Sequence, residues 1–242
     1  MLKFPLFGIP VGVHVTFLFI ALLGAMTYSG IDIAIWTAAA FVSILLHEMG
    51  HALTARKFGA KGIAVTLYGL GGVTNFRHGL QMSHGRSFLI SAAGSASGIV
   101  AGGALLLAAR NGVFDGVSHE MAVFLDSFIF TALVWGVLNW IPIVPLDGGH
   151  MVESLAAMVS EERAPLISQV ITWTTVAIVA PLAYLNGYQF AAIIVVMFAF
   201  SGLREYRAKA ERQKAKSRLP ADPQPAPPAD PTPQTPPPEF PI

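Results

Sequence analysis

The sequence predicts an all-α membrane protein of six transmembrane helices, with a short membrane-associated β-hairpin between helices two and three. Of the 242 residues, 54% are hydrophobic and 12% are charged, with a mean hydropathy of +0.60. A soluble domain carries about a quarter charged residues. Six long apolar runs and a one-sided distribution of basic residues complete the prediction.

The six runs have about the length, roughly 20 residues, that a helix needs to cross the hydrocarbon core of a bilayer. They lie at 10–28, 33–55, 87–109, 121–141, 166–185 and 188–203. The first run follows Lys3 and could also be a signal peptide. Because it is long and no A-x-A cleavage site follows it, we predict a retained membrane helix.

The basic residues test this topology, because cytoplasmic loops of membrane proteins collect Lys and Arg. With six spans, 14 of the 15 basic residues fall on one side and only Arg110 falls on the other. We therefore expect a multi-pass protein with both termini in the cytoplasm. The chain is compact and lacks organelle-targeting features, so we expect a prokaryotic plasma membrane. The net charge of +1 makes a nucleic-acid partner unexpected.

Three segments outside the six runs have their own character. Residues 62–76 place a β-branched run around a glycine-rich turn, which predicts a hairpin, either a surface loop or a partly inserted element. Residues 204–219 are basic and should lie on an anionic leaflet. The segment 220–242 holds 11 of the 17 prolines and is predicted to be a disordered tail. This tail either solubilises the chain or docks a cytoplasmic partner.

The second run contains an H-E-x-x-H motif formed by His47, Glu48 and His51. Histidines at i and i+4 lie on one helix face, at the spacing that places two imidazoles on one zinc ion. Glu48 would lie beside the metal as a general base acting on water. Charged and polar side chains are costly within a membrane helix unless they serve a site. We therefore predict one bound zinc ion.

A catalytic zinc site uses three protein ligands, and the absence of cysteine leaves His, Asp or Glu for the third. Asp147 follows Pro142 and Pro145 and precedes two glycines, on backbone that should be irregular. Irregular backbone at membrane depth is tolerated around a polar cavity. Asp147 is therefore the favoured third ligand, with His150 as the competing candidate.

The two motifs together resemble those of the site-2 proteases, zinc metalloproteases that cut substrates within the membrane. His47 to His51 is similar to the family's H-E-x-G-H, and Asn139 to Gly149 to its N-x-x-P-x-x-P-x-D-G-G element. The resemblance implies that His47, His51 and Asp147 bind zinc, that Glu48 is the base, and that Asn139 lies near the substrate backbone. The stretch around Gly94 lacks the Pro and Asn of many relatives, which favours simple close packing of small residues there.

The resemblance also implies an organisation and a substrate. Residues 1–203 would form a six-span protease domain, with no room in the chain for a PDZ or nucleotide-sensing module. The hairpin corresponds to a membrane-inserted β element, whose free edge, including Gly71 and Gly72, would bind an extended substrate segment. Asn139 would support the same unwound backbone or, alternatively, make a helix-to-helix hydrogen bond.

The expected function is intramembrane endopeptidase activity on a substrate with a transmembrane helix, in regulated intramembrane proteolysis and near the cytoplasmic side. A metal-ion transporter is the alternative, since intramembrane His and Asp also mark ion pathways. A transporter would spread its ligands along a path, whereas these cluster at one depth. An inactive relative would be expected to have lost Glu48 or a ligand.

Overall fold

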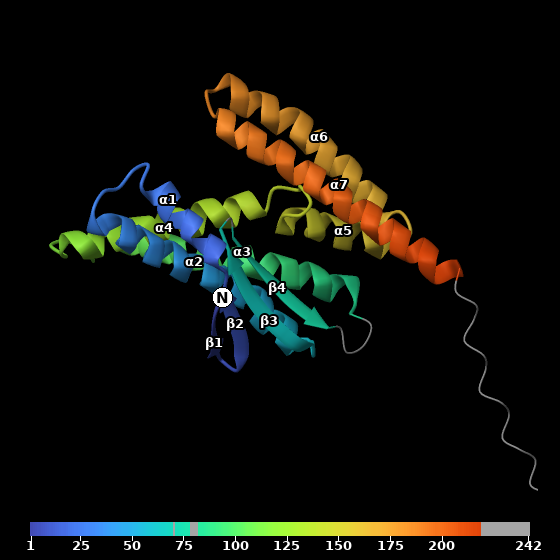
Figure 1. The fold of residues 1–242 in the computed structure, drawn as a ribbon, viewed down its shortest axis with the longest axis horizontal. Coiled ribbons are helices and arrows are strands. Elements are labelled where there is room, and N and C mark those ends of the chain that lie inside the picture. The colour runs from blue at the N-terminus through green and yellow to red at the C-terminus, as the bar shows by residue number, and fades with distance from the viewer. Residues whose placement is uncertain (70, 78–81, 219–242) are drawn as a thin grey trace, which may run out of the picture. The chain divides into compact units, whose positions relative to one another are not determined.

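The computed structural model describes residues 1–69, 71–77 and 82–218 (Figure 1). The chain divides into two compact units, Met1–Tyr206 and Arg207–Ile242. The predicted proline-rich tail, 220–242, lies outside the described residues. The predicted basic segment lies within helix α7 (Gln189–Arg218) as far as Arg218.

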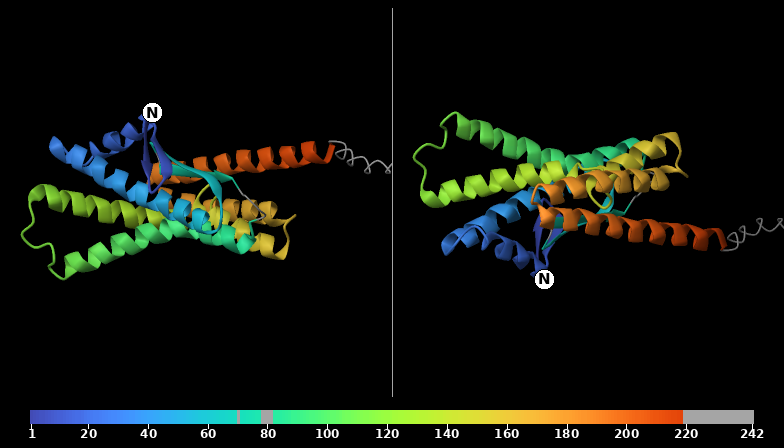
Figure 2. Two further views of the ribbon diagram at one scale, coloured as in Figure 1. Left: turned by 90° about the horizontal axis from the view of Figure 1, so that it is seen from below. Right: turned by 90° about the horizontal axis from the view of Figure 1, so that it is seen from above.

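Five of the six predicted spans form helices that are long and apolar enough to cross a membrane. In addition to α7, these are α2 (Ile31–Lys57), α3 (His84–Arg110), α4 (His119–Asn139) and α6 (Ala164–Leu185). Helices α2, α3 and α4 pack against one another (Figures 1 and 2). Ser83 and Ser118 cap the N-termini of α3 and α4 with their hydroxyl oxygens.

The prediction of a long helix over 10–28 is wrong. This segment forms strand β2 (Ile9–Val13), a 3-10 turn η1 (Val15–Leu18) and the six-residue helix α1 (Phe19–Gly24). Its β-branched residues at alternate positions favour a strand, and His14 ends that strand by accepting a hydrogen bond from the backbone N–H of Thr16. Hydropathy measures apolar character and not backbone shape, so it did not separate the two structures.

The N-terminal part of the chain nevertheless runs along α2 in the opposite direction. Arg56, near the end of α2, donates a hydrogen bond to the carbonyl of Phe7, at 2.7 Å. Near the start of α2, Trp36 donates its indole N–H to the carbonyl of Ile20, at 3.0 Å. The chain therefore begins beside the end of α2 and reaches its beginning before the helix starts.

The sheet is larger than the predicted hairpin. The hairpin is present as β3 (Lys61–Tyr68) and β4 (Gly71–Arg77), paired antiparallel. Strands β1 (Leu2–Leu6) and β2 extend it to a four-stranded sheet in the order β1-β2-β3-β4, with β2 and β3 parallel. Alternate residues of β3 are buried against α2, where the main apolar core lies; they are Ile63, Val65 and Leu67.

A short helix that the sequence analysis did not predict, α5 (Asp147–Val159), follows an irregular segment at 140–146. Ile143 in that segment is fully buried in a second core cluster with Val176 of α6 and Ala199 of α7. The segment thereby joins the α6–α7 pair to the start of α5.

Candidate metal centre

Helix α2 carries three of the predicted site residues toward its C-terminal end. His47, Glu48 and His51 are all buried, with 6%, 4% and 8% of their surfaces exposed. The i,i+4 spacing places the two imidazoles on one face, with their ring centroids 4.8 Å apart. Burial of three polar side chains on an apolar helix is costly unless they are paired or bind a ligand.

Asp147 is the first residue of α5 and reaches the same place from another part of the chain. Two glycines follow it, and a Cβ at either Gly148 or Gly149 would overlap backbone atoms of the irregular segment. This segment is also attached to α6. The backbone N–H of Val144 donates to the hydroxyl of Thr172, and Ser168 donates to the carbonyl of Gly149, both at 3.1 Å.

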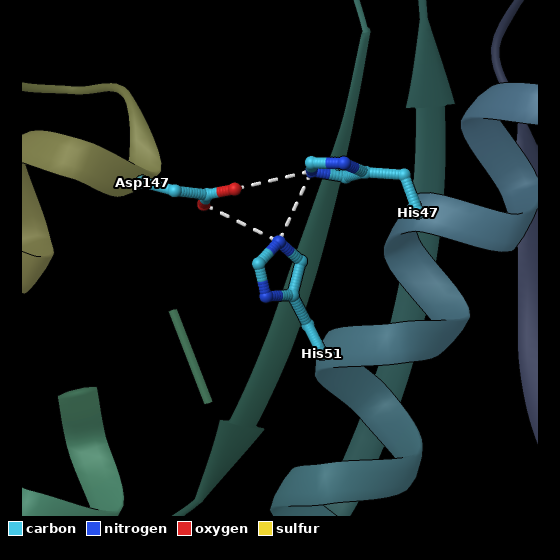
Figure 3. A group of neighbouring side chains, drawn as sticks. All are labelled: His47, His51 and Asp147. Carbon is cyan, nitrogen blue, oxygen red and sulfur yellow. Dashed lines mark hydrogen bonds and ion pairs between the residues drawn. The ribbon is translucent and has the colours of Figure 1, made fainter. Parts of the chain in front are cut away.

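The three predicted ligands meet in a compact triangle (Figure 3). The Nε2 atoms of His47 and His51 are 3.1 Å apart. The carboxylate of Asp147 lies 3.3 Å from each of them, through Oδ2 to His47 and through Oδ1 to His51. Among the described residues, this is the group of His, Cys, Asp and Glu side chains that is arranged to hold a metal ion.

The three side chains are close enough to share a metal ion, with one ligand atom from each lying within 4.8 Å of the others. With ligand atoms about 2.0–2.1 Å from a tetrahedral zinc ion, neighbouring ligand atoms are about 3.3–3.4 Å apart. The Nε2 atoms are 3.1 Å apart and each lies 3.3 Å from a different oxygen of Asp147, so each of these pairs has about the spacing of two zinc ligands. A fourth position then remains for water or substrate.

The hydrogen bonding of His51 suits a metal ligand. Its Nδ1 lies 2.7 Å from the carbonyl oxygen of Ile90, which only accepts, so Nδ1 carries a proton. In a neutral imidazole the lone pair is then on Nε2, the atom that faces His47 and Asp147 and that a metal ion would bind. Metal-bound histidines commonly donate their other N–H to a backbone carbonyl in this way.

Helix α3 completes the surroundings of the ligands. Ser95 donates a hydrogen bond to Oδ2 of Asp147 at 3.0 Å. Gly94 lies against the imidazole of His51, and a Cβ at this position would overlap the ring. From the sequence, this stretch was expected only to pack small residues closely against a neighbouring helix, and the role of Ser95 was not predicted. A serine among small residues carries no local signal for such a contact, although Gly98 and Gly102 do pack closely on α4, as expected.

Glu48 is held by strand β4 and not by the ligand triangle. The hydroxyl of Thr74 donates to Oε2 of Glu48 at 2.7 Å. Gly72 lies beside the same side chain, where a Cβ would be 2.7 Å from Oε1. Thr74 also escaped the sequence analysis, because nothing along the chain links this residue to α2.

The other candidate residues lie outside the triangle. His150 is one-third exposed and faces Glu153, with Nδ1 3.9 Å from Oε2. Asn139 donates to the carbonyl of Trp135, one turn earlier in its own helix, at 3.0 Å. Gly71 begins β4 with a φ of 138° and faces the indole of Trp135.

Comparison with known proteins gives concordant matches. A family model described as Peptidase family M50 matches residues 108–182, a range that includes Asp147. Zinc metalloprotease MJ0392 of Methanocaldococcus jannaschii is 27% identical over 84% of this chain, and Rip2 of Mycobacterium tuberculosis is 29% identical over 76%. The site-2 protease structure from Methanocaldococcus jannaschii matches 83% of this chain and 94% of that chain, with a TM-score of 0.61 and 24% identity.

These matches confirm the resemblance that the two motifs predict. Residues 108–182 are similar to the family M50 model, and the fold is similar to that of the archaeal site-2 protease. It spans 59% of the length of MJ0392 and 80% of the length of Rip2.

Proposed function

We propose that this chain, with its family M50 segment and site-2 protease fold, is an intramembrane zinc endopeptidase. It would hydrolyse a peptide bond in a membrane-embedded substrate, near the cytoplasmic side. The observation that carries the proposal is the buried cluster of His47, His51 and Asp147, which could hold a metal ion, with Glu48 on the residue of α2 that follows His47. All four side chains would lie at one depth in the membrane, and a hydrolytic site needs its metal ligands and its base close together.

Each side chain has a role that follows from its position. His47, His51 and Asp147 would hold one zinc ion, which when bound polarises a carbonyl and lowers the pKa of water. Glu48 takes a proton from the attacking water and passes it to the leaving amine. Ser95 keeps the Asp147 carboxylate oriented, and the carbonyl of Ile90 does the same for the His51 ring.

The proposed substrate is a transmembrane helix that unwinds locally, because a peptide bond is accessible to hydrolysis only when its backbone is extended. Strand β4 lies at an edge of the described sheet and contacts α2 beside Glu48. An unwound segment could add to this edge near Gly71 and Gly72. Asn139 is a weaker candidate for substrate contact, because its amide is engaged with its own helix.

The proposed orientation places both termini in the cytoplasm of a prokaryotic cell, with the protein in the plasma membrane. Five long apolar helices support an integral membrane protein. The contact between Arg56 and the carbonyl of Phe7 keeps the N-terminal strands at the same end of α2 as its basic residues. His47 lies about 15 Å from the C-terminal end of that helix, Lys57. Water would therefore reach the site from the cytoplasmic side.

Co-expression with tagged single-span membrane proteins tests the proposal. Wild type should release shortened fragments, and Glu48→Gln should leave the same proteins intact. His150→Ala, a change in the same short helix as Asp147 but outside the triangle, is the matched control and should cleave normally. Fragment masses would locate the cut, and a regulated role predicts a small number of substrates.

The same experiment separates a protease from a metal-ion transporter. If no protein in the panel is cut in a Glu48-dependent way, and purified protein in vesicles moves zinc across the bilayer, the protease proposal is wrong.

A further inference from the structure

The carboxylate of Glu48 is fixed by a neighbouring strand that supplies no metal ligand. The hydroxyl of Thr74 lies 2.7 Å from Oε2 of Glu48 and 3.1 Å from the backbone oxygen of the same residue. Glu48 is 4% exposed, so bulk water does not compete strongly for its carboxylate. Thr74 therefore makes a short, buried, charge-assisted contact.

The chemistry of a hydroxyl decides which of the two acceptors matters more. A threonine hydroxyl has one proton to donate. Hydrogen bonds to a carboxylate are shorter and stronger than those to a neutral carbonyl, so the proton is directed at Oε2. This leaves Oε1 as the oxygen free to accept a proton from water.

Gly72 provides the space that this orientation needs. Residues 72 and 74 of a strand point to the same face of the sheet, here toward Glu48. A Cβ at Gly72 would lie 2.7 Å from both Cδ and Oε1 of Glu48 and still closer to Cγ. Strand β4 thus leaves room for the Glu48 side chain at Gly72 and donates a hydrogen bond to it from Thr74.

We propose that Thr74 is a positioning residue for Glu48, setting which carboxylate oxygen faces the reacting water. The inference rests on the proposed function of Glu48 as a general base. A base must come within about 2.6–3.2 Å of the proton that it takes, and small misplacements of catalytic groups are costly. Thr74 acts through Glu48, the residue to which its hydroxyl donates.

Two kinds of measurement on the full chain test this role. The first is infrared spectroscopy of zinc-loaded protein in detergent, in which the wild-type minus Glu48→Gln difference identifies the Glu48 carboxylate band. The second is steady-state hydrolysis of fluorescein-labelled β-casein, an unfolded polypeptide that supplies extended segments. Thr74→Val removes the hydroxyl at constant size, Thr74→Ser retains it, and Thr66→Val makes the same change on β3 as a matched control.

The expected result is a shifted Glu48 band in Thr74→Val but not in Thr74→Ser or Thr66→Val. The kcat of Thr74→Val should fall about tenfold, as expected for the loss of a hydrogen bond to a charged group, with KM and zinc content unchanged. In a Glu48→Gln background, which lacks this carboxylate, Thr74→Val should cause no shift in the carboxylate region of the infrared spectrum.

An unshifted Glu48 band in Thr74→Val, or the same spectral change with and without Glu48, would overturn the inference. If wild type fails to cleave casein, the proposed function is contradicted for this probe, and the infrared arm still decides the inference. The two failures are therefore distinguishable.

Discussion

Gly94→Ala should weaken zinc binding although it lies outside the ligand set. In the structure, a Cβ built on Gly94 would lie 2.6 Å from Cδ2 of His51 and nearer still to Nε2 and Cε1. Real Cβ atoms essentially never come within 3.0 Å of such atoms, so this edge of the ring must retreat by at least about 0.4 Å. That exceeds the roughly 0.2 Å tolerance of a metal–ligand distance.

The expected loss of zinc affinity depends on how far the His51 imidazole can move. The His51 imidazole is held on its other side by the carbonyl of Ile90, at 2.7 Å, so retreat from α3 strains or breaks this contact. Changes to partners that orient a metal ligand typically cost 10–100-fold in affinity. We expect a loss of that size in Gly94→Ala, equivalent to about 1.4–2.7 kcal/mol.

The assay is zinc competition against a fluorescent chelator, with protein purified in detergent. Gly103→Ala is the matched control, because it lies in the same helix and a Cβ there meets nothing within 4 Å. Both changes gain up to about 1 kcal/mol of helix propensity, so the difference between them isolates the clash with His51. Equal zinc affinities in Gly94→Ala, Gly103→Ala and wild type would refute the reasoning.

Three further predictions concern the metal and its supports. Glu48→Gln should keep bound zinc and lose cleavage, whereas Asp147→Ala should lose zinc as well. Metal analysis of the purified variants checks this. A normal zinc content in Asp147→Ala would show that another residue is the third ligand. Thr172→Val leaves the buried N–H of Val144 without its acceptor and should lower the free energy of unfolding by about 1–3 kcal/mol. An unchanged denaturation midpoint would contradict that. Chelation should lower Tm, since zinc at 100 times its Kd adds about 2.7 kcal/mol, and His150→Ala should show the same zinc-dependent Tm as wild type.

Local features of the sequence were enough to predict five long helices and the placement of two of the three candidate ligands. An α-helix places residues i and i+4 on one face whatever surrounds it, so the relation between His47 and His51 is contained in the sequence. Length and apolar composition identified five helices, because a helix of about 20 apolar residues is long enough to cross a bilayer. Pro145 and Gly148 likewise indicated irregular backbone around Asp147. Proline restricts the backbone at its own position, and glycine frees it.

The N-terminal segment shows where local reasoning failed. Val11 and Val13 are apolar in either a membrane helix or a strand, and their strand is stabilised by pairing with Val65 and Leu67 of β3, far along the chain. Hydrogen bonds between strands depend on which segments meet. Composition therefore predicted a span at 10–28 where the folded chain forms a strand and short helical turns.

The surroundings of the site were decided only by tertiary structure. Ser95 reaches Asp147 because α3 packs against α5, and Thr74 reaches Glu48 because β4 packs against α2. Neither residue has a distinctive neighbour in the sequence, since serine and threonine suit many positions. A side chain's covalent geometry determines its contacts within its own helix, whereas its contacts with another element depend on how the whole chain packs. The sequence alone therefore predicted which side chains would form the candidate site, and packing determined what holds them in place.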